Sequence, residues 1–189
     1  MEPGTSLALD DILGRLGPTA TTVLIDGRSG SGKSTLAVQL HDKWTDSAIV
    51  RLDDIYPGWD GLSWAAEHVR RSLLEPRAAG HTGRWRQWDW DTAAPSAWHT
   101  VAPGQRLIVE GIGALTPATR ALADLGIWVD ADGTERKRRA LERDGETYRP
   151  HWDRWAAQED AFIARFQPSA CADLIAVLTA GGFEFTAPD

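Results

Sequence analysis

Cysteine is nearly absent from this chain of 189 residues, in which Cys171 is the only one. A single thiol cannot form an intramolecular disulfide, which excludes a secreted fold held together by disulfides. Long apolar runs are also missing, since no stretch reaches the ~18 to 20 apolar residues that a transmembrane helix needs. The first residues include the acidic Glu2 and no apolar run, so a signal peptide is not expected. The prediction is a cytoplasmic protein without a membrane partner.

Positive charge is in deficit as well. The chain has 20 Lys and Arg against 27 Asp and Glu, a formal net charge of -7. This balance argues against a sequence-independent nucleic-acid binder, which needs clustered cations to displace counterions from phosphates. The hydrophobic fraction of 42% and the charged fraction of 25% are ordinary for a globular protein, and the length fits one domain over residues 1–189.

Two further kinds of site lack their sequence patterns. The five histidines show no metal-ligand spacing, and Cys171 has no partner for a zinc site. No G-x-S-x-G segment is present, so Ser/His/Asp hydrolysis is not predicted.

Short apolar runs alternate with segments of helical character along most of the chain. The runs that predict strands are 22–26, 48–52, 106–110, 126–130 and 172–178. Helices are predicted at 10–16, 33–44, 63–74, 117–125, 134–143 and 152–166. Buried strands separated by helices indicate an α/β fold, here three α/β/α layers with a five-stranded parallel sheet. Ligands in such folds bind at the carboxyl ends of the strands.

A glycine-rich segment links the first strand to the helix that follows it. Residues 27–34 match the P-loop pattern G-x-x-x-x-G-K-[ST] in full. The backbone N–H groups of such a loop, together with the helix N-terminus, bind the phosphates of ATP or GTP. Lys33 is expected to reach the β- and γ-phosphates, and the Ser34 hydroxyl to ligate Mg²⁺. The predicted nucleotide-binding residues are Gly27, Arg28, Ser29, Gly30, Ser31, Gly32, Lys33 and Ser34.

Acidic residues end the second and third strands. Asp53 and Asp54 follow the run 48–52, and a carboxylate there can accept the proton of an attacking hydroxyl or hold the metal. Which of the two is the base stays open. Glu110 ends the run 106–110 and is a candidate for ordering Mg²⁺, directly or through water.

The helix predicted at 134–143 is rich in arginine. Arg136, Arg139 and Arg143 fall at i, i+3 and i+7, hence on one face, where they could neutralise charge during phosphoryl transfer. The alternative is a solvated face paired with nearby acids. The polar stretch after this helix suits a mobile flap, which gives a lid-like segment around 134–152.

The segment from Arg84 to Trp90 alternates aromatic with polar residues. One interpretation is a substrate surface in which an aromatic face, including Trp88, stacks on a planar ring while Arg84 binds hydroxyls or phosphates. The other is a half-buried edge strand with one wet face. The sequence does not decide between them.

These motifs together resemble the uridine kinase and phosphoribulokinase group of P-loop kinases. The similar pieces, in order, are Gly27 to Thr35, Asp53 to Tyr56, Glu110 to Ile112, Val129 to Asp144, and Ala172 to Ile175. The resemblance implies that Asp53 is the base, that Thr35 belongs to the nucleotide site, that Tyr56 lies near the acceptor, and that the arginines lie in or beside a lid helix. The segment after Tyr56 is unlike the uridine-binding segment of uridine kinases.

The expected function is transfer of the γ-phosphate of ATP, with Mg²⁺, to a small-molecule acceptor, first of all a uridine-like nucleoside. Asp54, Tyr56, Arg84 and Trp88 are the candidates for contacting it. Nucleoside monophosphate kinases such as adenylate or cytidylate kinases share the scaffold and remain an alternative. A nucleotide-dependent switch without an acceptor is the third. The sequence leaves open the acceptor, the preference between ATP and GTP, and the oligomeric state.

Overall fold

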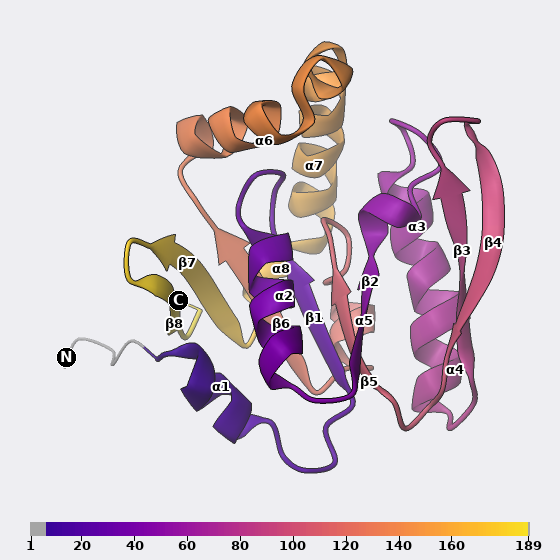
Figure 1. Ribbon diagram of the computed structural model, residues 1–189, viewed down its shortest axis with the longest axis vertical. Coiled ribbons are helices and arrows are strands. Elements are labelled where there is room, and N and C mark those ends of the chain that lie inside the picture. The colour runs from indigo at the N-terminus through magenta and orange to yellow at the C-terminus, as the bar shows by residue number, and fades with distance from the viewer. Residues whose placement is uncertain (1–6, 189) are drawn as a thin grey trace.

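A mostly parallel sheet forms the centre of the computed structural model, which describes residues 7–188 (Figure 1). Its strand order is β2-β5-β1-β6-β7-β8. The strands are β1 (Thr22–Asp26), β2 (Ser47–Arg51), β5 (Arg106–Glu110), β6 (Leu125–Asp130), β7 (Leu174–Thr179) and β8 (Gly182–Thr186). The first five are parallel and lie close to their predicted bounds, which confirms the predicted sheet. Strand β8 adds an antiparallel edge that was not predicted.

Helices cover both faces of this sheet, as a three-layer fold requires. Side chains alternate along β1, so Leu24 packs in one core and Val23 and Ile25 in the other. The core that holds Val23 is covered by α1 (Leu9–Arg15) and α2 (Lys33–Lys43). The opposite core is covered by α3 (Leu62–His68), α5 (Pro117–Arg120), α7 (Trp152–Phe166) and α8 (Pro168–Cys171).

The helix predicted at 63–74 continues past its expected end. It begins as α3, widens into the π-helical segment η2 (Val69–Leu74), and ends as α4 (Glu75–Ala78). The predicted end lies two residues before Pro76, but this proline lies in the first turn of α4. A proline has no N–H for a helical hydrogen bond and clashes with the carbonyl four residues before it. The wider π turn changes this spacing just before Pro76, and the chain continues through the proline.

The irregular middle of the chain forms a hairpin beside α3 (Figure 1). Strand β3 (Gly83–Asp89) pairs antiparallel with β4 (Ala94–Val101). Trp85 is buried while Arg84 and Arg86 are exposed, so the alternation is that of a half-buried strand.

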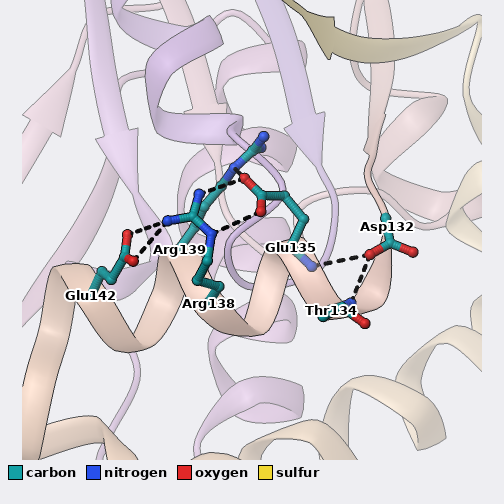
Figure 2. A network of polar contacts seen from close by, with 6 residues as sticks. All are labelled: Asp132, Thr134, Glu135, Arg138, Arg139 and Glu142. Carbon is teal, nitrogen blue, oxygen red and sulfur yellow. Dashed lines mark hydrogen bonds and ion pairs between the residues drawn. The ribbon is translucent and has the colours of Figure 1, made fainter.

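The arginine-rich helix is longer than predicted and bends. Asp132 caps the N-terminus of helix α6 (Gly133–Tyr148), and its side chain accepts hydrogen bonds from the N–H groups of Thr134 and Glu135 at 2.9 and 3.1 Å (Figure 2). Gly145 interrupts it with φ 56° and ψ -136°. The short 3-10 turn η3 (Arg149–His151) then leads into α7, whose bounds are those predicted. No helix within residues 7–188 is long and apolar enough to cross a bilayer.

Candidate active site

The P-loop, residues 27–34, connects the end of β1 to the start of α2 (Figure 1). Gly30 has φ +77°, and a Cβ added there would collide with the backbone carbonyl of Arg136, so this position requires glycine. Gly32 precedes α2 in a left-handed conformation with φ 105°. The sequence therefore folds here into the strand, loop and helix that the pattern predicts.

The loop also contains a buried polar group that suits the binding of an anionic ligand. The side chain of Ser31 is fully buried within the loop, and its hydroxyl has no hydrogen-bond partner among the described residues. Buried polar groups nearly always have a partner, so an orphaned hydroxyl inside a turn lined with N–H groups matches a loop that closes around phosphate oxygens.

A pocket of about 630 Å³ opens beside the loop, at the carboxyl ends of β1, β2 and β5. Its walls come from the P-loop, from the ends of β2 and β5 and the segments after them, from the tip of the β3–β4 hairpin, and from α6 and α7. They are Ser29, Gly30, Lys33, Ser34, Arg51, Asp53, Asp54, Tyr56, Trp59, Trp90, Glu110, Ile112, Arg143, Asp144, Thr147, Tyr148 and Trp155. The location is the one that the general rule for parallel sheets predicts.

Ser34 and Glu110, both predicted metal ligands, are in direct contact in this pocket. The Ser34 hydroxyl donates a hydrogen bond of 2.9 Å to Glu110 Oε1. Glu110 is 2% exposed, and burial raises the pKa of its carboxyl group above the ordinary value. Arg51 Nε lies 3.6 Å from the same oxygen and offsets part of the negative charge. A hydroxyl and a carboxylate are oxygen donors of the type that Mg²⁺ prefers.

No cluster of three or more His, Cys, Asp or Glu side chains arranged for a metal exists within residues 7–188.

Asp53 and Asp54 lie in the 3-10 turn η1 (Leu52–Asp54), which follows β2 directly. Both line the pocket. Burial, and then the neighbouring charge of Asp53, raise the pKa of the Asp54 carboxyl group. The backbone carbonyl of Asp53 accepts a 2.9 Å hydrogen bond from the indole of Trp90 at the hairpin tip. Asp53 is the more exposed of the two.

Lys33 and Tyr56 also reach the pocket. Lys33 Nζ donates to the backbone carbonyl of Arg28 at 3.1 Å, within the loop that it is expected to serve. The Tyr56 hydroxyl donates to the carbonyl of Ile112 at 2.6 Å, and its ring meets the edge of Trp155 at a centroid distance of 4.7 Å. Tyr56 is 2% exposed, so its ring is part of the wall and its hydroxyl belongs to the structure behind it.

The three predicted arginines of α6 have different surroundings. Arg143 lines the pocket and forms a bidentate pair with Asp144 at 2.6 and 2.8 Å, which raises the pKa of its guanidinium. Arg136 donates to the Ser29 carbonyl at 3.1 Å and so holds the P-loop from outside. Arg139 pairs with Glu135 at 2.7 Å, in the surface network of Figure 2.

Arg28, Thr35, Arg84 and Trp88 also lie outside the pocket walls. Arg28 pairs with Asp160 at 2.6 Å, and Thr35 is exposed on α2. Arg84 stacks over Trp98 on the outer side of the hairpin at 4.7 Å, and Trp88 lies in β3. The structure thus brings neither Arg84 nor Trp88, both candidates for contacting the acceptor, to the pocket.

Sequence reasoning did not select several residues that shape the site. Glu159 of α7 is 1% exposed, and its Oε1 accepts hydrogen bonds from the Ser29 N–H at 2.8 Å and the Trp155 indole at 3.1 Å. An acid on the apolar stripe of a helix, between Trp155 and Phe162, is a signal that could have found it. Arg51 and Trp59 had no comparable signal, whereas Trp90 ends the alternating segment 84–90, for which a substrate surface was one of the two interpretations.

Comparisons with known proteins bear on the fold. No protein-family model and no curated protein sequence matches the chain. It is similar to the solved structure of a possible uridine kinase from Bacillus stearothermophilus, with 21% identity and a TM-score of 0.63, over 88% of this chain and 94% of that one. Phosphoribulokinase from Rhodobacter spheroides is similar with 15% identity and a TM-score of 0.57, over 85% and 71% of the two chains. The predicted α/β/α fold, of the kind found in P-loop kinases, is thereby confirmed.

Proposed function

We propose that the protein is a small-molecule kinase that transfers the γ-phosphate of ATP to a hydroxyl group of its acceptor. The observation that carries this proposal is that Lys33, the Ser34–Glu110 pair and Asp53 all line one pocket. A nucleotide-dependent switch needs Lys33, Ser34 and Glu110, but it does not need an acceptor base such as Asp53. The solved structures of a possible uridine kinase and of phosphoribulokinase, which have the same fold, also support a kinase.

In the proposed reaction the acceptor oxygen attacks the γ-phosphorus while the bond from that phosphorus to the β,γ-bridging oxygen breaks. The acceptor hydroxyl loses its proton to the Asp53 carboxylate, and ADP leaves. The P-loop amides and Lys33 hold the phosphates, and Arg143 takes up charge that develops on the transferring group. Ser34 and Glu110 would hold Mg²⁺, which neutralises phosphate charge when bound.

The lid role of residues 134–152 is part of this proposal. Gly145 interrupts α6 next to the pocket residues Asp144 and Thr147, where a change of backbone angles would move the wall nearest the phosphates. Closure of such a wall excludes water and completes a phosphoryl-transfer site.

For the acceptor, we favour a planar compound of the nucleoside type. Five aromatic side chains line the pocket: Tyr56, Trp59, Trp90, Tyr148 and Trp155. Walls of this kind favour flat apolar rings. The alternative is a nucleoside monophosphate, favoured by Arg51, whose side chain is 42% exposed and lines the same pocket. A guanidinium there suits an acceptor phosphate.

The test is ADP release from ATP, and in parallel GDP release from GTP, with a panel of nucleosides and nucleoside monophosphates. Acceptor-stimulated release is the expected result, and a flat rate with every acceptor would favour the switch. Lys33→Ala is expected to abolish turnover. Asp53→Asn should lower turnover by roughly 10²- to 10⁴-fold while ATP affinity changes little. Normal turnover by Asp53→Asn would shift the base to Asp54 or another group.

A further inference from the structure

The carboxyl group of Asp26 is the least exposed acidic group near the site, and the proposed reaction does not use it. Asp26 ends β1 immediately before the P-loop and is 0% exposed. Burying a carboxylate is costly unless hydrogen bonds compensate. The compensating bonds therefore show what this residue holds together.

Both oxygens of Asp26 accept hydrogen bonds, and the donors come from two different segments. Oδ1 accepts from the N–H of Gly27, the first residue of the P-loop, at 2.6 Å. Oδ2 accepts from the N–H groups of Gly113 and Leu115 at 3.1 and 2.7 Å. Those two residues belong to the turn that follows Glu110. One side chain thus links the phosphate loop to the segment that carries the predicted metal ligand.

This link begins where the sheet ends. The backbone ladder between β1 and β5 runs to the pair Ile25 and Glu110, and one more bond joins the Gly111 N–H to the Ile25 carbonyl at 3.1 Å. Beyond that point no ladder bond joins the two segments among the described residues, and the Asp26 carboxylate continues the connection. The Ser34 hydroxyl and Glu110, 2.9 Å apart, lie on the two segments that it joins.

We propose that Asp26 is a positioning residue that fixes the P-loop against the turn after Glu110 and thereby sets the geometry of the Ser34–Glu110 pair for the nucleotide-bound metal. This inference rests on the proposed function, because it assumes that Ser34 and Glu110 serve a Mg²⁺–nucleotide complex. Asp26 does not line the pocket and acts only through the groups that it holds.

The chemistry of the three donors makes Asp26→Asn a sharp test. An asparagine has one acceptor oxygen and one NH₂ donor in the same shape as the carboxylate. With its oxygen toward Gly113 and Leu115, the NH₂ group opposes the Gly27 N–H. In the flipped orientation the NH₂ group opposes the two turn amides. Either orientation breaks the link on one side, although the side-chain volume is unchanged.

Asp173 provides a matched control. Its Oδ2 accepts from the Gly126 N–H at 2.7 Å and its Oδ1 from Arg120 at 2.6 Å, so both oxygens are again acceptors. It lies just before β7 and next to the start of β6, at the amino ends of the parallel strands, whereas the P-loop lies at their carboxyl ends. Asp173→Asn removes one acceptor oxygen in the same way without touching the site, at a side chain that is 37% exposed.

The experiment compares the affinity of ATP with and without Mg²⁺ for the wild type, Asp26→Asn and Asp173→Asn, at temperatures where each is folded. It is done at pH 8, because burial raises the pKa of Asp26 to about 7 and the carboxyl group is ionised above that value. Asp26→Asn is expected to reduce the gain in affinity that Mg²⁺ confers by about tenfold, equal to about 1.4 kcal/mol. Asp173→Asn should keep the wild-type gain. An unchanged gain in Asp26→Asn would refute the inference while leaving the kinase proposal intact, and failure of the wild type to bind ATP would refute the kinase proposal.

Amide hydrogen exchange in the wild type tests the link without any variant, should Asp26→Asn not fold. The N–H groups of Gly27, Gly113 and Leu115 are expected to exchange together and as slowly as those of β1, because one buried carboxylate holds all three. Exchange of these amides at the rate of exposed loop amides would overturn the inference.

Discussion

Removal of the Glu159 side chain tests how strongly α7 holds the P-loop. Glu159 is buried and accepts two hydrogen bonds on one oxygen, from Ser29 in the loop and from Trp155 in its own helix. In Glu159→Ala both donors lose their acceptor. The buried Trp155 donor without a partner costs about 1 to 3 kcal/mol, and the Ser29 donor, which lines the pocket and can bind water instead, costs about 1 kcal/mol, so the expected loss in the free energy of unfolding is about 2 to 4 kcal/mol.

Glu159→Gln separates the charge of this residue from its hydrogen bonds. The amide oxygen still accepts from both donors, while its NH₂ group replaces the oxygen that lies 3.8 Å from Arg28. Neutral hydrogen bonds are weaker than those to a charged group by about 1 kcal/mol each, so the expected loss is about 2 kcal/mol. Asp160→Asn is the matched control, because Asp160 pairs with the same arginine at 2.6 Å but its side chain is 66% exposed. Its effect should stay below about 0.5 kcal/mol.

Urea unfolding measures these differences, with the slope of the transition checked for constancy between variants. ATP affinity is the second readout, because Ser29 lies in the P-loop and loses its anchor in Glu159→Ala. If Glu159→Ala unfolded at the wild-type urea concentration, the hydrogen bonds from Ser29 and Trp155 would contribute nothing net, and the assignment of Glu159 as an anchor of the loop would be wrong.

Two further predictions concern charge. Arg143→Ala should lower kcat by roughly 10²- to 10³-fold, because Arg143 lines the pocket. Arg138→Ala should leave kcat unchanged, since Arg138 pairs with Glu135 and Glu142 on the surface (Figure 2). Equal losses of kcat in the two variants, measured by steady-state kinetics, would contradict this prediction. Burial raises the pKa of Asp26 from 3.8 to about 7, against the hydrogen bonds from Leu115 and Gly27 and the attraction of Lys33, so the folded state binds the proton more tightly than the unfolded state. The stability of the wild type relative to Asp26→Asn should therefore fall as pH rises from 4 towards 7, by up to about 3 kcal/mol, and a flat difference in urea unfolding across this range would contradict it.

The parallel strands and the P-loop could be predicted because each depends on a local signal. The run 22–26 is apolar and β-branched, the glycines follow at once, and the next helix has its apolar stripe at Leu36 and Leu40. These signals agree with the tertiary packing, so they needed no long-range information. Strand β8 also alternates, with Phe183 and Phe185 buried and Glu184 exposed, but it is short and was not recognised.

The face of a helix could be predicted, but the partner of each side chain could not. The spacing of one helix face holds for Arg136, Arg139 and Arg143. However, Arg139 forms an ion pair with Glu135, one turn before it in the same helix. Only Arg143 reaches the pocket wall. An intrahelical acid competes for each arginine, and the outcome depends on distances that the sequence does not contain.

Contacts between segments that are distant in the sequence could not be predicted either. The bond from Ser29 to Glu159 joins residues 130 positions apart, and the bond from Leu115 to Asp26 joins residues 89 apart. The order of the strands decides that such segments meet. From the sequence alone, Asp26 is only the last residue of a strand, and Glu159 only an acid within a helix.

The buried acids within residues 7–188 share one location. They are Asp26, Glu110 and Glu159, and each accepts a hydrogen bond from the P-loop, from Gly27, Ser34 and Ser29 respectively. A glycine-rich loop has few side chains to pack, so its shape must be held by bonds to its backbone. Carboxylates form the strongest such hydrogen bonds, and they are tolerated in the interior only where hydrogen-bond donors surround them. Because Asp26 and Glu159 do not line the pocket while Glu110 does, the first two bind the side of the loop that faces away from the pocket and leave its inner surface open to the pocket.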